Sequence, residues 1–401
     1  MLLNFKSEIN ESTIKDLSKD KNEPEWMLKK RLNSYYLYKN LEEPSNKYGL
    51  GIINKQGTIN IDNKIKNTQN KLPSNSSTII ESFENAIKNH ESLIKENFMT
   101  HCINPSENKY VALHNSLWNN GVLIFIPKDN INKDPINITL DNKEEAQFNN
   151  ILIIAEENCG STILINKTSN KINKFSSNII EVITKSNSKL NIVNFQDLEN
   201  NSNDFSTTKI LQKNSSNVTY TEFGFGSNSS NSKISSILGG GEANSKIYSL
   251  NYCTNTQNFD INISTIHKSP FTYSDILSAN ILDNKAKLIF NGLIKIENNA
   301  HNSVGYQKEE NLLLSKEAEV YPIPNLQIEN YDVKCSHSAS TTNIDEEKIF
   351  YLMSRGLTEE QTKKLVIKGY FNKFLSLINN EEVKDIIESS INGKSKYASL
   401  N

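Results

Sequence analysis

The chain has 401 residues, enough for two or three domains or for one elongated repeat body with helical ends. Its formal net charge is −2, with 44 basic and 46 acidic residues, so no overall field marks it as a nucleic-acid or anionic-membrane binder. No apolar run approaches the roughly 18 residues that span a bilayer, and the N-terminal stretch lacks the pattern of a signal peptide. We therefore expect a soluble, cytoplasmic protein.

The N-terminal part of the chain carries helical patterns. Residues 11–43 alternate charged and apolar positions at helical spacing, and Pro44 ends the run, which predicts a helical arm. Residues 44–73 are polar and suit a loop-rich connector, and a second helix is predicted over residues 78–98. The residues expected on one face of the arm are Trp26, Leu28, Leu32, Tyr35, Tyr36 and Leu41.

Around Tyr110 the pattern changes from helices to short strands. Asn120-Gly121 is a possible turn, and two β-branched apolar runs follow at residues 122–126 and 136–140. From there to about residue 328, four to six residues of alternating character are followed each time by a polar turn. We therefore place a strand-built core at residues 110–330.

One phrase, Ser followed by any residue and an aliphatic, recurs in this stretch at a nearly constant step. The steps are 27, 28, 29 and 29 residues, with no helix between the copies, which is typical of a solenoid whose coils each contain several short strands. The pattern favours a parallel β-helix, and an antiparallel sandwich or barrel is the alternative. The phrase begins at Ser161, Ser188, Ser216, Ser245 and Ser274.

Helical signals return after the strands. Asn343 or Asp345 can cap a helix that has two glutamates in its first turn and ends at Arg355-Gly356. Its expected inner face contains Ile349, Phe350 and Met353.

A second C-terminal helix begins with the capping box Thr358-x-x-Gln361, and a third is expected after Asn380. Residues 331–401 are thus predicted to form a C-terminal segment followed by a small helical domain, and residues 1–109 a helical N-terminal region with its connector.

A thiol and an imidazole lie two residues apart at Cys335 and His337. If this segment is extended, both side chains leave the same face, because side chains alternate along a strand. A soft metal accepts both ligands, although two ligands fall short of a closed structural site, so the site would be labile or shared between subunits. The alternative is a buried thiol that packs as a small hydrophobe beside a hydrogen-bonded histidine.

Other chemistry is sparsely represented in the sequence. Cys159 and Cys253 lie in strand-like segments where structural packing is the default, and Cys102 carries no assignment. No CxxC pair, phosphate-binding loop or hydrolase motif is present, so free thiols in a reducing compartment are expected. A β-helix also suggests a polysaccharide lyase or hydrolase with paired carboxylates, but the acidic residues of the strand region are scattered.

The segment DVKCSHSAS, followed by IDEEKIFYLMSRGL, resembles the C-terminal signature of the SufB/SufD family, the scaffold subunits of the SUF iron–sulfur cluster assembly machinery. Similar segments are EPEWMLKKRLNSYYLYKNLEEP near the N-terminus, ALHNSLWNNGVLIFIPKDNINKDPI at the entry to the strands, and NLLLSKEAEVYPIPNLQIENYDV before the signature. The resemblance covers most of the chain and is weakest between about residues 45 and 100.

The resemblance implies a right-handed parallel β-helix with helical ends. It also implies a scaffold subunit without enzymatic activity of its own, which pairs with a SufB-like β-helix chain or with itself and binds the SufC ATPase through its C-terminal helices. Cys335 and His337 would then be candidate ligands of a transient iron–sulfur cluster at the subunit interface. Phe350, Tyr351 and Arg355 would be candidate ATPase contacts.

Between the two types of chain in the family, the signature favours the D type. CSHSA is one substitution from the D-type CSHGA, whereas B-type chains continue HEA after the histidine, where this chain has Ser338. Ser236 stands where B-type chains carry a strand cysteine. The EPEWML helix is more B-like, so a SufB-like or merged B/D chain that forms a homodimer is the alternative.

Overall fold

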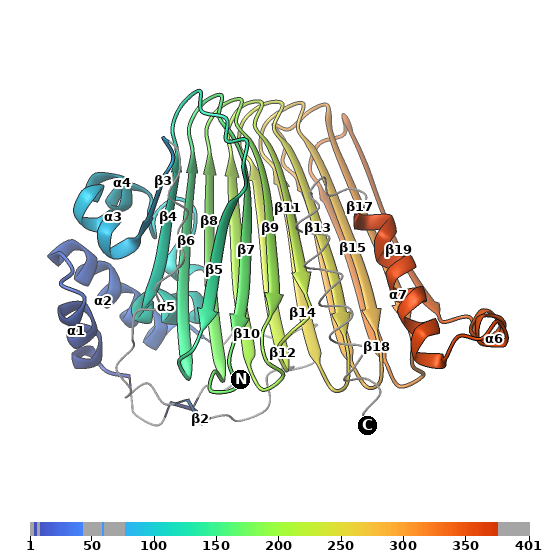
Figure 1. The fold of residues 1–401 in the computed structure, drawn as a ribbon. Coiled ribbons are helices and arrows are strands. Elements are labelled where there is room, and N and C mark those ends of the chain that lie inside the picture. Colours follow the sequence, from blue (N-terminus) through green and yellow to red (C-terminus); the bar gives the residue numbers. More distant parts are fainter. Residues whose placement is uncertain (1–3, 6–8, 43–57, 60–76, 376–401) are drawn as a thin grey trace.

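The body of the molecule is a parallel β-helix of two long sheets with helices at both ends (Figure 1). This computed structural model describes residues 4–5, 9–42, 58–59 and 77–375. The nine-stranded sheet contains, in spatial order, β18 (Glu319–Ile328), β16 (Lys287–Ile296), β14 (Asn258–His267), β12 (Ser229–Leu238), β10 (Asn203–Gln212), β8 (Phe175–Thr184), β6 (Ala146–Ala155), β4 (Asn120–Ile126) and β3 (Ile79–Ser82). The eight-stranded sheet contains β19 (Val333–Asn343), β17 (Ser303–Leu313), β15 (Tyr273–Leu282), β13 (Asn244–Cys253), β11 (Asn217–Gly224), β9 (Lys189–Asp197), β7 (Gly160–Ser169) and β5 (Ile136–Asn142).

Consecutive strands alternate between the two sheets, so each coil contributes one strand to each. All pairings in the two sheets are parallel except that of β3 with β4. This confirms the parallel β-helix and excludes the antiparallel sandwich. A separate short pair joins β1 (Asn4–Phe5) to β2 (Thr58–Ile59). The eight-stranded sheet extends past residue 330, because β19 pairs with β17 along its whole length.

The repeated serine phrase follows the coils but not one register. Ser245 lies opposite Ser274, whereas Ser161 lies opposite Leu190 and Val218 opposite Ser245. Two of the phrase's steps are therefore displaced by two residues from the true register. A shift of two keeps every side chain on its original face, which explains why the period was readable from sequence.

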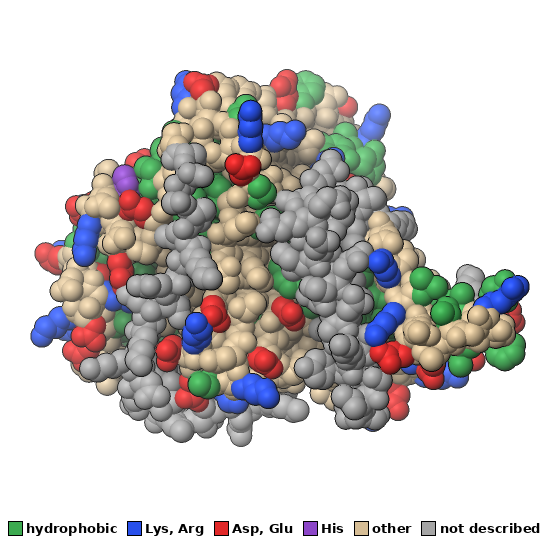
Figure 2. Space-filling view, viewed as in Figure 1, with side chains coloured by type: hydrophobic (Ala, Val, Ile, Leu, Met, Phe, Trp, Pro, Cys, Tyr) green, Lys and Arg blue, Asp and Glu red, His purple; other side chains and the backbone are tan. Residues whose placement is uncertain are grey.

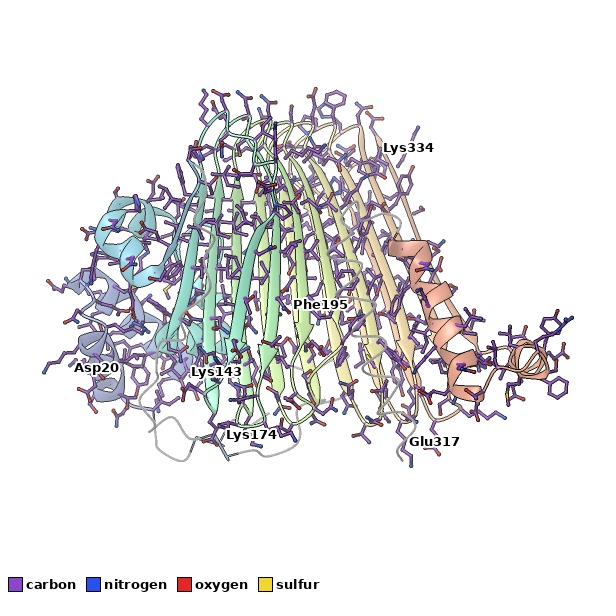
Figure 3. The ribbon with its side chains drawn as sticks, in the orientation of Figure 1. Asp20, Lys143, Lys174, Phe195, Glu317 and Lys334 are labelled. Carbon is purple, nitrogen blue, oxygen red and sulfur yellow. The ribbon has the colours of Figure 1, made fainter. Side chains whose placement is uncertain are left out.

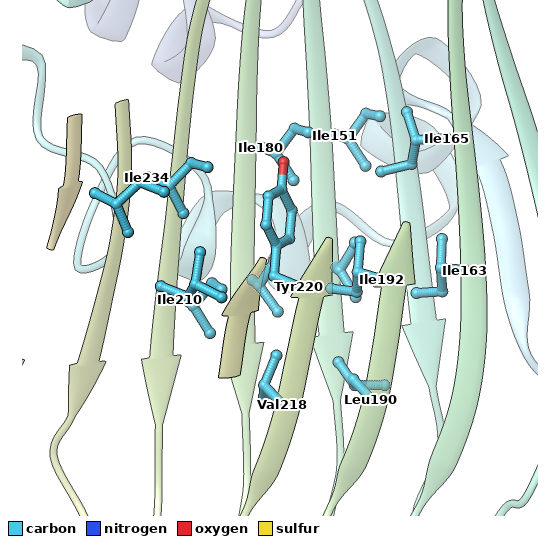
Figure 4. Close-up of a cluster of buried hydrophobic side chains, with 14 of the residues drawn as sticks. Ile151, Ile163, Ile165, Ile180, Leu190, Ile192, Ile210, Val218, Tyr220 and Ile234 are labelled. Atoms are coloured by element: carbon cyan, nitrogen blue, oxygen red, sulfur yellow. The ribbon is translucent and has the colours of Figure 1, made fainter. Parts of the chain in front are cut away.

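The lumen between the sheets is filled mainly by aliphatic ladders (Figure 4). On the eight-stranded sheet one such ladder runs through six successive strands, and each member is at most 5% exposed. Fully burying each of these side chains contributes about 1.5–3 kcal/mol. The ladder consists of Ile136, Ile163, Ile192, Tyr220, Ile247 and Ile276.

The turns that lead into the eight-stranded sheet form a column of left-handed residues. Each has φ between 53° and 60°, and each backbone N–H donates to a carbonyl of the next turn. Asn and Asp tolerate this conformation best among residues with a side chain. The column consists of Asp129, Asn158, Asn187, Ser215, Glu242, Phe271 and Asn302. Phe271 departs from the pattern, and its ring is 56% exposed.

Helices cover the N-terminal end of the solenoid (Figure 1). They are α1 (Glu11–Asp20), α2 (Glu25–Asn40), α3 (Phe83–Asn89), α4 (Glu91–Asn97), the 3-10 helix η1 (Pro105–Glu107) and α5 (Lys109–Leu117). The predicted arm is thus two helices, and its buried face differs from the expected one. Arg31 is fully buried on α2, where it makes two 2.7 Å hydrogen bonds to the carboxylate of Glu23, and Tyr36 is 46% exposed.

Two predictions for the segment before the core were wrong. Residues 79–82 form β3 instead of the first turn of a helix, because they pair with β4, and the remaining helix breaks at His90. Asn120-Gly121 is not a turn, since both residues lie in β4 opposite Asn149 and Asn150. The connector at residues 44–73 lies outside the described residues except for β2.

Two helices follow the solenoid, α6 (Glu346–Ser354) and α7 (Glu359–Leu375). The capping box is confirmed, because Thr358 N–H donates to Gln361 Oε1 at 2.9 Å and Gln361 N–H donates to Thr358 Oγ1 at 3.2 Å. Asp345 caps α6 by accepting the N–H of Glu347 at 3.1 Å. α7 packs on the outer face of the eight-stranded sheet, where the rings of Phe371 and Phe225 are 5.9 Å apart.

α6 projects away from the body (Figure 1). Phe350 and Met353, expected on its inner face, are 74% and 41% exposed, because no described sheet surface lies beneath this helix. The helix predicted after Asn380 lies outside the described residues. Within the described parts of the chain, no helix is both long and apolar enough to cross a membrane.

Candidate functional site

The strand that carries Cys335 and His337 is the edge of the eight-stranded sheet. β19 pairs with β17 on one side and has no neighbour on the other among the described residues. Cys335 lies opposite Gly305, and His337 lies opposite Gln307. Figure 3 marks Lys334, the residue before Cys335, near the upper end of this last strand.

Both side chains belong to the lumen face of the strand. Val333 and Cys335 pack against the aliphatic core, and alternation places His337 on the same face. Cys335 is half-buried, and this burial raises the pKa of its thiol, opposed by a hydrogen bond with the backbone of Gly305. His337 is exposed.

A thiolate and an imidazole are both ligands that iron accepts. Two side chains do not complete a coordination sphere, and no three His, Cys, Asp or Glu side chains in the described segments are grouped so as to hold a metal ion. Cys335 and His337 therefore form at most part of a site in the isolated chain.

Among the described residues, the solenoid is open at the end where β18 and β19 lie. The side chains of β18 that share the register of core residues are exposed there, including Leu326 at 37% and Ile328 at 40%. Their counterparts one coil earlier, Ile294 and Ile296, are fully buried. No described residue therefore covers the apolar lumen at this end, whereas helices cover the other end.

The backbone edges of the two last strands differ. The amides of Glu319 in β18 and of Glu329 just after it donate to the β16 side of the sheet. Because these groups alternate along a strand, the nitrogens of Pro322 and Pro324 face the open edge, and proline has no N–H to offer there. Immediately after β19, the amide of Ile344 donates to Leu313 at the end of β17, so the even-numbered residues of β19 bond to β17. The N–H groups of the odd-numbered residues therefore face the open edge. A further strand can therefore pair with β19, whereas the two prolines of β18 remove donors that such pairing needs.

Beneath the candidate ligands lie two buried polar side chains that no sequence motif singled out. Gln307, directly opposite His337, is 2% exposed, and neither of its amide atoms has a hydrogen-bond partner among the described residues. Glu309 is 0% exposed; its Oε1 accepts a 3.0 Å bond from Asn311, and its Oε2 has no partner among them. Burial raises the pKa of Glu309 to about 7.

The candidate ATPase contacts lie together on α6. Phe350 and Tyr351 are 74% and 56% exposed, and the Arg355 guanidinium lies 5.1 Å from the centre of the Tyr351 ring. Figure 2 shows hydrophobic side chains gathered on this projecting end. An exposed group of aromatic, Met and Arg side chains has the composition found at the centres of protein interfaces.

The other three thiols are buried. Cys159 and Cys253 are buried members of the lumen core. Cys102 is fully buried beneath the N-terminal helices, and its Sγ lies 3.2 Å from the carbonyl of Lys209. His267 is enclosed in the lumen between the hydroxyls of Thr272 and Ser274, each at 2.8 Å.

Comparison with known proteins gives a consistent result. The family model described as "SUF system FeS cluster assembly, SufBD core domain" matches residues 138–370, more than half of the chain. An iron–sulfur cluster assembly SufBD family protein of Staphylococcus haemolyticus is 24% identical over 423 residues, covering 92% of this chain and 90% of the relative. A SufBD family protein of Staphylococcus aureus is 25% identical over 424 residues with the same coverage. The chain therefore belongs to the SufBD family of iron–sulfur cluster assembly proteins of the SUF system.

Proposed function

We propose that this chain is a D-type, SufD-like scaffold subunit. In this role it supports ATP-driven iron–sulfur cluster assembly in the cytoplasm, together with a SufB-like chain and a SufC-like ABC ATPase, and has no enzymatic activity of its own. The observation that carries the proposal is the position of Cys335 and His337 on an unpaired terminal strand, beside uncovered lumen residues.

The open end is suited to a second β-helix chain. Docking would cover Leu326 and Ile328 and supply a strand to the free backbone groups of β19. Apolar contact and backbone pairing together supply the driving force of a specific protein interface. A site completed by a second chain is also consistent with the two-ligand geometry of Cys335 and His337.

The nascent cluster is the cargo of this site and is held only transiently. An interface ligand set can open when the two chains move, which a fixed four-ligand cage within one chain cannot do. The exposed residues of α6, Phe350, Tyr351 and Arg355, provide the docking surface for the ATPase whose nucleotide cycle would drive that movement.

Two features support the D type over the B type. Ser338 follows His337, so no carboxylate stands next to the imidazole in the chain. Ser236 stands where B-type chains carry a strand cysteine. It is fully buried in the lumen, where its hydroxyl donates to Gln212 Oε1 at 2.9 Å and accepts from Ser245 at 2.8 Å. A merged B/D chain that forms a homodimer remains the alternative. Family membership favours the scaffold over a polysaccharide lyase or hydrolase.

Anaerobic purification of the tagged chain with its co-expressed neighbours tests the proposal. The expected result is co-purification of an ABC ATPase and a second SufBD-family chain, with iron and sulfide in the complex. A homodimer with the ATPase would support the merged chain. A monomer that cleaves polygalacturonate would refute the scaffold function.

A further inference from the structure

The lumen ladder that is aliphatic through most of the solenoid becomes polar in its last two coils. After Ile247 and Ile276, the next positions in register are Gln307 and His337. In the neighbouring ladder Ser249 and Ser278 are followed by Glu309 and Ala339. The aliphatic ladder thus becomes polar where the solenoid opens, next to a ladder that already carries polar residues.

Among the described residues, Glu309 and Gln307 have fewer hydrogen-bond partners than the buried glutamate Glu222 in an earlier coil. Glu222, at the same position as Glu309 three coils earlier, contacts the hydroxyls of Tyr220 and Ser232 at 3.1 and 2.5 Å. Within the part of the chain that the structure describes, one oxygen of Glu309 and both amide atoms of Gln307 have no hydrogen-bond partner. A buried polar group without a partner destabilises the fold, and a charged group does so more strongly, which points to a ligand that satisfies these atoms.

The residues around Gln307 and Glu309 have small side chains. Ala339, the smallest lumen-facing side chain of β19, stands over Glu309 at the open end. On the opposite sheet Gly292 faces Gln307, and a Cβ at this glycine would lie 2.2 Å from Gln307 Nε2. A glycine is therefore required for the Gln307 side chain to occupy the lumen in this orientation.

We propose that Glu309 Oε2, the Gln307 amide oxygen and the His337 imidazole bind a divalent metal ion at the mouth of the lumen. Paired residues on adjacent strands lie about 4.8 Å apart, and diagonal neighbours remain within reach of long side chains, so His337 can share a ligand with both residues below it. One carboxylate, one amide oxygen and one imidazole suit a divalent first-row ion such as Fe²⁺. Asn311 orients the carboxylate by holding its other oxygen.

This site differs from the thiol–imidazole pair, because it shares His337 with that pair but uses Glu309 and Gln307 in place of Cys335. It deepens the proposed function, on which it rests, by giving iron an entry position next to the interface. Its remaining coordination positions face the open end, where water or the second chain supplies ligands.

Anaerobic titration with Co²⁺, followed by its visible absorption, tests the site in the full chain and in the complex. Glu309→Ser and Gln307→Ile introduce the residues that the preceding coils carry at these positions, so both variants are compatible with the fold. We expect each to weaken Co²⁺ binding by roughly tenfold or more. Glu310→Gln is the matched control: it alters the next residue, which faces outward and pairs with Lys308 at 2.6 Å, and is expected to leave binding unchanged.

Unchanged Co²⁺ affinity in Glu309→Ser, or no Co²⁺ binding by the wild type in either preparation, would overturn the site. If Cys335→Ser loses Co²⁺ binding and Glu309→Ser retains it, the metal ion would instead be assigned to the thiol–imidazole pair. Absence of a second β-helix chain from the wild-type preparation would count instead against the proposed function, so the two failures are distinguishable.

Discussion

His337 lies opposite Gln307 in the last ladder of the solenoid, with no further strand beyond it among the described residues. The imidazole is therefore presented at an open strand edge rather than enclosed within the coil. Replacing it should affect what binds at that edge more than the fold below.

We predict that His337→Ala abolishes cluster accumulation on the anaerobically purified complex, while the subunits still assemble. The imidazole is an exposed ligand candidate outside the described hydrophobic core, so its loss removes a ligand without leaving a cavity. Ser338→Ala, on the outer face of the same strand, is the control. Iron and sulfide content equal to wild type would exclude His337 as a ligand.

On α6, Phe350→Ser and Arg355→Glu should weaken ATPase binding without lowering the Tm of the chain, because both side chains are exposed on the projecting helix. Ile172→Ser, at an equally exposed apolar position on the solenoid, is the control, since Ile172 is 62% exposed. The measurement is the ATPase retained on the immobilised chain. These substitutions are preferable to truncation near residue 344, because removing α7 would uncover the core around Phe225. Full retention in both variants would place the ATPase elsewhere.

Phe271→Asn should stabilise the isolated chain. Phenylalanine is unfavourable in the left-handed region, whereas asparagine is the residue that the column of turns uses most, so the gain is on the order of 1 kcal/mol. The contact between the Phe271 and His301 rings, 5.4 Å apart, is lost in exchange. Thermal unfolding tests the balance, with Asn302→Phe as the reverse substitution. A lower Tm for Phe271→Asn would mean that the ring contact outweighs the backbone cost.

Glu181 joins the N-terminal helices to the solenoid and should make stability depend on pH. Its carboxylate accepts the amides of Met99 and Ile103 at 3.4 and 3.0 Å, and burial raises its pKa from 4.5 to about 7. Between these values the folded chain keeps a proton that the unfolded chain releases. The stabilisation is therefore present below about pH 4.5 and is lost as the pH rises to about 7.

Tm measured across this range should fall less in Glu181→Gln than in the wild type. Glu309 has a similarly raised pKa and contributes the same trend to both proteins. Glu157→Gln, which alters an exposed turn, should follow the wild-type slope. Equal slopes in all three proteins would show that Glu181 is ionised in the folded chain.

The coil period was predictable because the repeated serine phrase stays on one face even where its register shifts by two residues. The shared face of Cys335 and His337 followed from alternation alone. The capping box at Thr358 and Gln361 was also a local signal, read from four consecutive residues.

Features that depend on the neighbouring coil were not predictable. Gln307 and Glu309 precede His337 by about 30 residues, and the lengths of the intervening turns decide which residues lie opposite. Residues 79–82 became a strand because β4 offered them an edge, a tertiary effect that outweighs local helical spacing. The exposure of Phe350 followed from α6 having no described sheet beneath it, which its amphipathic pattern did not reveal.

The central claim is that β19 accepts a strand of a second SufBD-family chain, and Ala339→Pro tests it most directly. The N–H of Ala339 faces the open edge, so proline at this position removes a donor to the partner chain and leaves the bonds to β17 intact. Ser340→Pro is the control, because it removes a donor to β17 and should lower the Tm. The measurement is the amount of the second chain that co-purifies with the tagged variant. We predict that Ala339→Pro retains the wild-type Tm and loses the second chain; co-purification at the wild-type level would contradict strand pairing at β19.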